Sequence, residues 1–125
     1  MKVEVSTGEL VDKYSILQIK RQRIVNDGKL AAIMAEINSL QKSFDSIYDS
    51  IENEYYELTL INDELWDVID HCDELYFANR NEEQQEAFVR LAERTIELNN
   101  RRFRIKSAIN DITSSKIVEV KSHLS

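Results

Sequence analysis

The feature that most constrains this chain is an apolar pattern that repeats at alternating spacings of three and four residues along its middle. Side chains at these spacings lie on one face of an α-helix, so the pattern predicts a heptad seam about six repeats long. The seam consists of Leu30, Ile33, Ile37, Leu40, Phe44, Ile47, Ile51, Tyr55, Leu58, Ile61, Leu65, Val68, Cys72 and Leu75. One helix of this length would span about 70 Å, against about 30 Å for a small compact domain. We therefore expect the helix over 29–78 either to break near 43–50, where Ser and Asp weaken helix propensity, or to extend into an elongated bundle.

A shorter helix is predicted before the seam, over about 7–26. Ser6 and Glu9 have the spacing of a capping box, in which each side chain reaches the backbone N–H of the other residue. The apolar residues of this helix occupy more than one face, which favours packing on several sides. Gly28 follows, and we expect it to end the helix in the left-handed conformation that glycine adopts without steric cost.

A last helix is predicted over about 82–113, with Asn79 or Asn81 as its N-terminal cap. Short alternating segments at 2–5 and 116–121 are expected to be extended and to pair with each other. The chain has no Pro and only two Gly residues, so it lacks the turn signals of β architectures. The predicted fold class is all-α, either an antiparallel helical hairpin or a three- to four-helix bundle.

Charge is unevenly distributed along the chain, whose formal net charge is −7. Residues 1–40 carry six basic and five acidic groups, residues 41–100 carry four and sixteen, and residues 101–125 carry six and two. An acidic middle between more basic ends favours a chain that folds back on itself. Nucleic-acid binding needs a basic excess on one face, so nucleic acid is a disfavoured partner.

Length and composition predict a single domain over 1–125, located in the cytoplasm. The single Cys72 cannot form an internal disulfide, and the N-terminus lacks the apolar stretch of a signal peptide. No apolar run approaches the roughly 20 residues that cross a bilayer, so we expect no membrane association. The sequence contains no Gly-rich phosphate loop and no pattern for Ser-His-Asp or Cys-His catalysis, and we expect no cofactor and no metal site.

One set of charged residues is expected to lie inside the fold. In an antiparallel hairpin that turns near Arg80, positions equidistant from the turn face each other. This geometry would bring Glu54 and Glu57 against Arg102 and Lys106. The favoured interpretation is a buried ion-pair network that sets the helix register, and the alternative is a pocket for a carboxylate or phosphate. The candidate residues are Lys13, Lys20, Glu54, Glu57, Asn99, Arg102 and Lys106.

Two enzyme classes are alternatives for these residues. Inward Arg and Lys groups are typical of chorismate-mutase-like helical enzymes, which hold a dicarboxylate and stabilise its transition state. The pair Glu54 and Glu57 matches half of the magnesium site of helical nucleotide pyrophosphohydrolases. The second half is not evident, because Glu93 and Glu97 point away from the seam of the last helix. A further stripe of carboxylates lies opposite the long seam and indicates a solvated face; it consists of Asp63, Asp67, Asp70 and Glu74.

Several stretches of the chain carry a resemblance to a known group of proteins. They are 3–13 (VEVSTGELVDK) with 15–20, 62–66 (NDELW), 99–102 (NNRR) with Lys106, Ile109 and Asn110, and 118–122 (VEVKS). On these residues the chain resembles an uncharacterised family of small helical proteins from bacteria and their phages. The resemblance implies an all-helical fold and no known activity, with some relatives associated with glycosyltransferases. The chain departs from the family at 38–55, which contains no Pro, whereas the family has a Pro-containing loop there.

We interpret the chain as a non-enzymatic helical interaction module that forms a homo-oligomer or binds a protein partner. The basis is a seam too long for one compact monomer to bury easily. The rival hypothesis is a small enzyme or anion-binding protein centred on Arg102 and Lys106.

Overall fold

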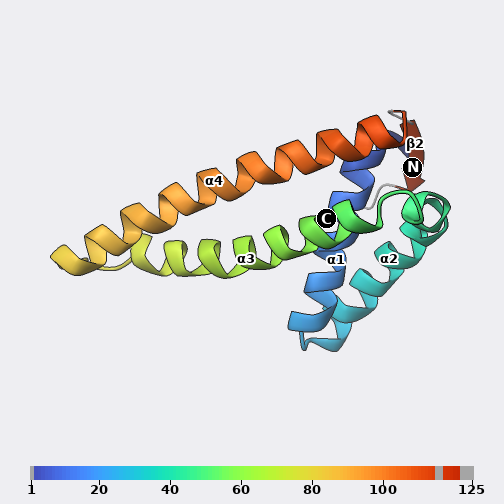
Figure 1. Ribbon diagram of the computed structural model, residues 1–125. Coiled ribbons are helices and arrows are strands. Elements are labelled where there is room, and N and C mark those ends of the chain that lie inside the picture. Colours follow the sequence, from blue (N-terminus) through green and yellow to red (C-terminus); the bar gives the residue numbers. More distant parts are fainter. Residues whose placement is uncertain (1, 115–116, 122–125) are drawn as a thin grey trace.

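Two helical hairpins and a two-stranded ribbon make up the part of the chain that the computed structural model describes, residues 2–114 and 117–121 (Figure 1). Side chains are described for residues 5–114. In chain order the elements are β1 (Lys2–Ser6), α1 (Thr7–Arg23), α2 (Asp27–Tyr48), α3 (Glu52–Tyr76), α4 (Glu82–Ile112) and β2 (Ile117–Lys121). The predicted all-α class, with helices in hairpins or a bundle, is therefore confirmed.

The first hairpin, α1 with α2, begins at Ser6 as predicted, but only one of the two hydrogen bonds of the predicted capping box is present, because the Glu9 carboxylate pairs with Lys106. Ser6 Oγ accepts a hydrogen bond from the backbone N–H of Glu9 at 3.2 Å. The helix ends at Arg23, three residues earlier than expected, because Asn26 caps the next helix by accepting from the N–H of Lys29 at 3.0 Å. Gly28 lies in the first turn of α2 and does not have a positive φ, so its predicted role as a left-handed C-terminal cap is wrong.

The long seam divides between α2 and α3, and the break lies at Asp49–Ile51, at the edge of the 43–50 stretch that we expected to break. Serine side chains satisfy backbone carbonyls there, because Ser50 Oγ donates to the carbonyl oxygen of Ile47 at 2.8 Å. Ile51 precedes α3 with no side-chain cap and is fully buried. Its burial fixes the turn against the core and lets α2 fold back along α1 instead of continuing into α3.

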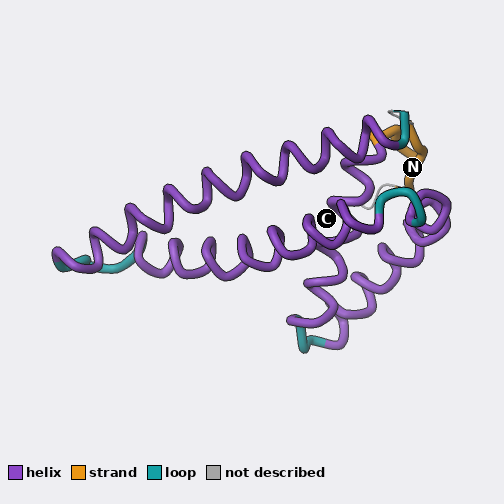
Figure 2. Tube along the Cα trace, in the orientation of Figure 1, coloured by secondary structure: helices purple, strands orange, loops and turns teal. Residues whose placement is uncertain are grey.

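The second hairpin, α3 with α4, is the longest feature of the molecule (Figure 1). Asn81 starts α4 with a complete capping box, since its side chain accepts from the N–H of Gln84 at 2.8 Å and the Gln84 side chain accepts from the N–H of Asn81 at 2.9 Å. Figure 2 shows that the loop joining the two helices is short, and that both helices extend well past α1 and α2. Only the inner half of this hairpin is covered by the first hairpin.

The core lies where α1, α2 and the inner half of the α3–α4 hairpin meet. A stack of aromatic rings marks its centre, with the Tyr14 and Phe44 centroids 3.9 Å apart and Tyr55 at 4.9 Å from Phe44. The core residues are Leu10, Val11, Tyr14, Leu17, Ile33, Ile37, Leu40, Phe44, Ile47, Ile51, Leu58 and Ile109. The apolar faces of α1 and α2 therefore end up buried against each other and against the inner hairpin.

The ribbon joins the two ends of the described chain. β1 and β2 pair antiparallel, with Val3 opposite Val120 and Val5 opposite Val118. This is the pairing expected for the segments 2–5 and 116–121, although Lys116 lies outside the described residues. The ribbon follows α4 and precedes α1, so it brings the start of α1 to the end of α4.

Candidate functional site

A buried carboxylate, Asp12 of α1, lies at the crossing of three helices. Its side chain is 5% exposed. Arg102 of α4 donates from Nε to Oδ1 at 3.0 Å and from Nη2 to Oδ2 at 2.5 Å, which is the two-pronged geometry of a strong Arg–carboxylate pair. Asn62 of α3 donates to Oδ1 at 3.0 Å, and Lys106 Nζ is 3.6 Å from Oδ2. We call Asp12, Asn62, Arg102 and Lys106 the Asp12 cluster.

The positions of these residues along their helices explain why they converge. Arg102 and Lys106 are four residues apart and therefore project from the same face of α4. Asn62 is buried at the middle of α3 and also donates to Ser15 Oγ at 3.3 Å. Figure 1 shows that α1 crosses the α3–α4 hairpin, and α1 contacts both of its helices. Asp12 therefore reaches all three side chains at once.

The cluster stabilises the charged forms of both Asp12 and Arg102. Burial alone raises the pKa of the Asp12 carboxyl, but hydrogen bonds from Arg102 and Asn62, with the charges of Arg102 and Lys106, outweigh it, so the pKa lies below 3.8. The hydrogen bond to Asp12 raises the pKa of Arg102. Lys106 is also paired with the Glu9 carboxylate at 2.6 Å. The cationic groups of the cluster are therefore already compensated within the chain.

Further polar contacts hold the start of α1 against α4. Asn110 Oδ1 accepts from the backbone N–H of Gly8 at 2.7 Å, and the hydroxyls of Thr7 and Thr113 share a buried hydrogen bond. A Cβ on Gly8 would lie 2.5 Å from the carbonyl oxygen of Lys106, so only glycine allows the two helices to approach this closely. Residues from three of the stretches that carry the family resemblance thus meet at one junction of α1, α3 and α4: Gly8 and Asp12, Asn62, and Arg102 with Lys106 and Asn110.

The structure brings together only part of the predicted site. Arg102 and Lys106 lie side by side as expected, and Asn99 Oδ1 accepts weakly from Arg102 Nη1 at 3.4 Å. The expected acidic partners, Glu54 and Glu57, form no ion pair with any residue whose side chain is described. Asp12 and Glu9 take their place, because α1 lies across the hairpin and supplies the acids.

The two lysines of the predicted set line a cavity beside the Asp12 cluster, whose walls also include Glu9 and Asp12. Lys13 and Lys20 line this cavity, which has a volume of about 250 Å³, together with Glu36 of α2, and Lys13 Nζ is 4.0 Å from the Glu36 carboxylate. This distance makes a weak surface pair at most. The cavity therefore has charges of both signs on its walls and no concentration of cations.

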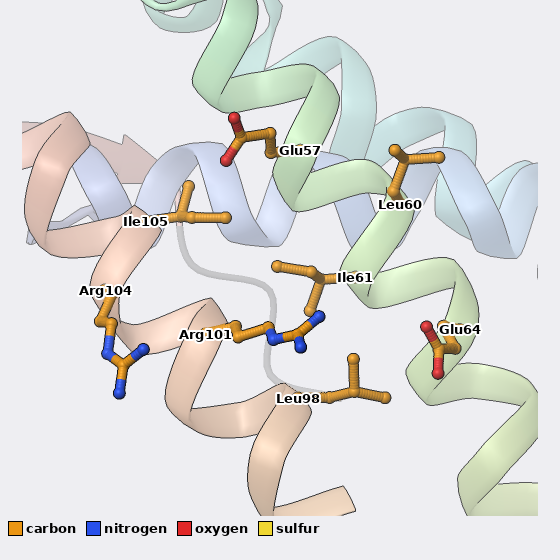
Figure 3. Close-up of a pocket in the computed structure, with 8 residues that line it drawn as sticks. All are labelled: Glu57, Leu60, Ile61, Glu64, Leu98, Arg101, Arg104 and Ile105. Atoms are coloured by element: carbon orange, nitrogen blue, oxygen red, sulfur yellow. The ribbon is translucent and has the colours of Figure 1, made fainter. Parts of the chain in front are cut away.

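A larger groove lies on the α3–α4 hairpin, and Figure 3 shows its lining. Its volume is about 460 Å³, and it is lined by Glu57, Leu60, Ile61, Glu64, Leu98, Arg101, Arg104 and Ile105. Figure 3 shows Arg101 extending toward α3 and Arg104 pointing away from it. Arg94 donates to both oxygens of Glu64, which lowers the pKa of that carboxyl, and Arg101 pairs with Glu97 at 2.6 Å. Two of the four charged residues that line the groove, Glu64 and Arg101, are thus paired along the hairpin, whereas Glu57 and Arg104 form no ion pair with a residue whose side chain is described.

The exposed apolar side chains are the feature that sequence reasoning missed. Among the residues whose side chains are described, every large exposed hydrophobic residue except Val25 belongs to α3, α4 or the turn between them. They are Tyr56, Leu60, Ile69, Tyr76, Phe77, Val89, Ile96, Phe103 and Ile112. Three of them, Val89, Ile96 and Phe103, recur every seven residues along α4. That spacing is visible in the sequence and is the signal that could have revealed a second seam on this helix.

The described residues contain neither a metal-binding cluster nor a helix that could cross a membrane. No group of three or more His, Cys, Asp or Glu side chains is arranged to hold a metal ion within this part of the chain. None of its helices combines the length and the apolar character that a membrane span requires.

Comparison with known proteins gives the chain a family and no activity. The model of a family of unknown function, DUF6165, matches residues 1–124. No curated protein and no solved structure matches the chain. Because the family model covers nearly the entire length, the chain belongs to this family of unknown function.

Proposed function

We propose that this protein is a non-catalytic helical interaction module that self-associates through the outer face of α4. The observation that carries the proposal is the outer stripe, which we define as Val89, Ile96 and Phe103. Their exposed fractions are 44%, 64% and 69%, although the solvent-exposed face of a helix is normally polar.

The stripe lies on the side of α4 that faces away from α3. At 100° per residue, residues seven positions apart share one face, whereas the buried Leu98 projects from the opposite face toward α3. A helix with apolar residues on two opposite faces is suited to pack between two neighbours. Within the chain α3 occupies one side, and a second copy would occupy the other as in a coiled coil.

The charges beside the stripe support contact between like copies. Along one edge of it, Glu93 and Glu97 lie between Arg90 and Arg104. Charges of both signs are therefore present, so two copies of α4 would not face each other with charges of one sign only.

The Asp12 cluster supports a structural role for the predicted anion site. A chorismate-mutase-like enzyme would need Arg102 and Lys106 free to bind a dicarboxylate, yet Asp12 and Glu9 already neutralise them. Both cations would have to leave an internal carboxylate before they could hold a ligand.

Sedimentation velocity over a concentration series tests the proposal. Burying one isoleucine contributes about 1.5–3 kcal/mol, and 1.4 kcal/mol corresponds to about a tenfold change in Kd. Ile96→Glu should therefore weaken self-association at least about tenfold. Asn38→Glu introduces the same side chain at an exposed position of α2 and should leave it unchanged. A wild-type protein that remains monomeric at about 100 µM, or an Ile96→Glu variant that associates like the wild type, would contradict the proposal.

A further inference from the structure

The end of the α3–α4 hairpin farthest from the core carries a cluster of aromatic rings. The Tyr76 and Phe77 centroids are 5.0 Å apart with nearly perpendicular planes, and the Phe88 ring is 6.3 Å from Tyr76. Tyr76 is 63% exposed and Phe77 is 84% exposed, the second highest exposure among the large hydrophobic residues described. We call Tyr76, Phe77 and Phe88 the aromatic tip.

The tip is held in place by the turn beneath it. Arg80 Nη1 donates to the carbonyl oxygens of Leu75 and Tyr76 at 2.6 and 3.1 Å, and its Nε donates to Gln85 at 2.7 Å. The guanidinium also lies over the Phe88 ring, 4.5 Å from its centroid. Arg80 therefore closes the α3 end of the turn and contacts the Phe88 ring, so it links the turn to the aromatic tip. Tyr and Arg are among the residue types that contribute most to binding at protein interfaces, and an aromatic ring has few rotatable bonds to immobilise on binding.

The surroundings of the tip are strongly acidic. Between residues 70 and 86 the chain has one basic residue, Arg80, and six carboxylates, which are Asp70, Asp73, Glu74, Glu82, Glu83 and Glu86. All six are exposed, and none forms an ion pair with another residue whose side chain is described. Two carboxylates nearer the start of α3, Asp63 and Asp67, differ in this respect, since Arg23 pairs with Asp63 at 2.7 Å and with Asp67 at 2.6 Å. Within the described part of the chain, six unpaired carboxylates thus surround the aromatic tip, with Arg80 as the one basic residue among them.

We infer that the aromatic tip binds a cationic amphipathic segment of a partner protein. Apolar side chains of the segment would pack on Tyr76 and Phe77, and its Lys or Arg side chains would face the surrounding carboxylates and the ring faces. Nucleic acid and anionic lipid surfaces carry the same sign of charge as the tip and are repelled by it. The tip of a second copy is equally acidic, so the tip is not the self-association surface.

This inference rests on the proposal that the module binds proteins, and it does not depend on self-association through the outer stripe. The test is a fluorescence anisotropy titration of the full chain with two labelled peptides that differ only in charge. One is an amphipathic helix of Leu and Lys, and the other replaces each Lys with Glu. The wild type should bind the Lys peptide with an affinity that falls as salt is raised, and should not bind the Glu peptide.

Variants locate the binding on the molecule. The double variant Tyr76→Ala with Phe77→Ala should weaken binding of the Lys peptide at least about tenfold, which is typical of losing a central aromatic anchor. Glu82→Gln with Glu83→Gln should weaken binding and reduce its salt dependence. Tyr56→Ala removes an equally exposed aromatic residue of α3 away from the tip and serves as the matched control.

The outcomes separate this inference from the proposed function. Equal affinity of the wild type and the Tyr76→Ala, Phe77→Ala variant overturns the inference, and so does a wild type that does not bind the Lys peptide. Circular dichroism shows whether each variant remains helical. Sedimentation of the tip variants should match the wild type, so that loss of peptide binding and loss of self-association are scored independently.

Discussion

Replacement of Asp12 by Asn is the most demanding test of the buried cluster. The carboxylate accepts from Asn62 and Arg102 on Oδ1 and from Arg102 on Oδ2, so an amide must direct its own NH2 group at one of these donors. The substitution also leaves the Arg102 guanidinium beside a neutral group, with its side chain 28% exposed. Breaking a buried ion pair typically costs about 3–5 kcal/mol, and the partial access of Arg102 to water favours the lower end, about 3 kcal/mol.

Urea denaturation followed by circular dichroism measures this loss. A loss of about 3 kcal/mol should also lower Tm by roughly 10–15 °C for a domain of this size. Arg23→Ala breaks an exposed ion pair with Asp63 and Asp67 and should cost far less, which makes it the matched control. The double variant Asp12→Asn with Arg102→Met should lose less than the sum of the single variants, with a coupling of about 1–2 kcal/mol.

A small effect would refute the structural interpretation of the cluster. If Asp12→Asn is within about 0.5 kcal/mol of the wild type, Asp12 does not hold the three helices together. A thermal-shift screen with dicarboxylates and phosphorylated sugars then tests the anion-pocket hypothesis. A ligand-induced stabilisation that Arg102→Met abolishes in a folded protein would favour that hypothesis over ours.

Two further predictions concern the same junction. Gly8→Ala places a Cβ 2.5 Å from the carbonyl oxygen of Lys106, and we expect a loss of about 1–3 kcal/mol in urea denaturation, whereas Gly28→Ala in the exposed first turn of α2 should be nearly neutral. The pKa of Asp12 is lower in the folded than in the unfolded chain, so its contribution to stability is present above pH 3.8 and is lost as pH falls through the folded pKa. In an acid titration of stability, the wild type should therefore lose more between neutral pH and the acid transition than Asp12→Asn does; equal losses would contradict this.

Local signals in the sequence were enough to predict most of the helices. Ser6 and Asn81 cap α1 and α4 as their side-chain chemistry requires, and the Ser- and Asp-rich stretch 43–50 lies next to the break between α2 and α3. The end of α1 was harder, because Asn26 and Gly28 offer competing signals. The N-cap of the following helix prevailed over the left-handed C-cap, and local propensity does not rank two such signals.

Only half of the candidate site could be predicted, because the other half depends on how the helices pack in the tertiary structure. An antiparallel hairpin places residues of its two helices opposite each other, and this geometry identified Arg102 and Lys106 as inward-facing groups. It could not supply Asp12, which comes from a helix crossing that hairpin. The available signal was an acid on the same face as Ile16 and Ile19, in a helix that is apolar on more than one side.

The outer stripe was missed because the stronger seam of the same helix hides it. Phe88, Leu91 and Leu98 belong to the stronger seam, of which Leu98 is buried, and the exposure of Val89, Ile96 and Phe103 shows that their seven-residue repeat is a separate stripe. Burial against α3 depends on the register of the hairpin, which heptad spacing alone does not determine.

A dilution series of ¹⁵N-¹H NMR spectra tests the central claim most directly, because it locates a contact between copies residue by residue. We predict concentration-dependent shifts of the amides around Val89, Ile96 and Phe103, with the amides of α2 unchanged. Spectra that do not change with concentration, or shifts confined to α1 and α2, would contradict self-association through the outer face of α4.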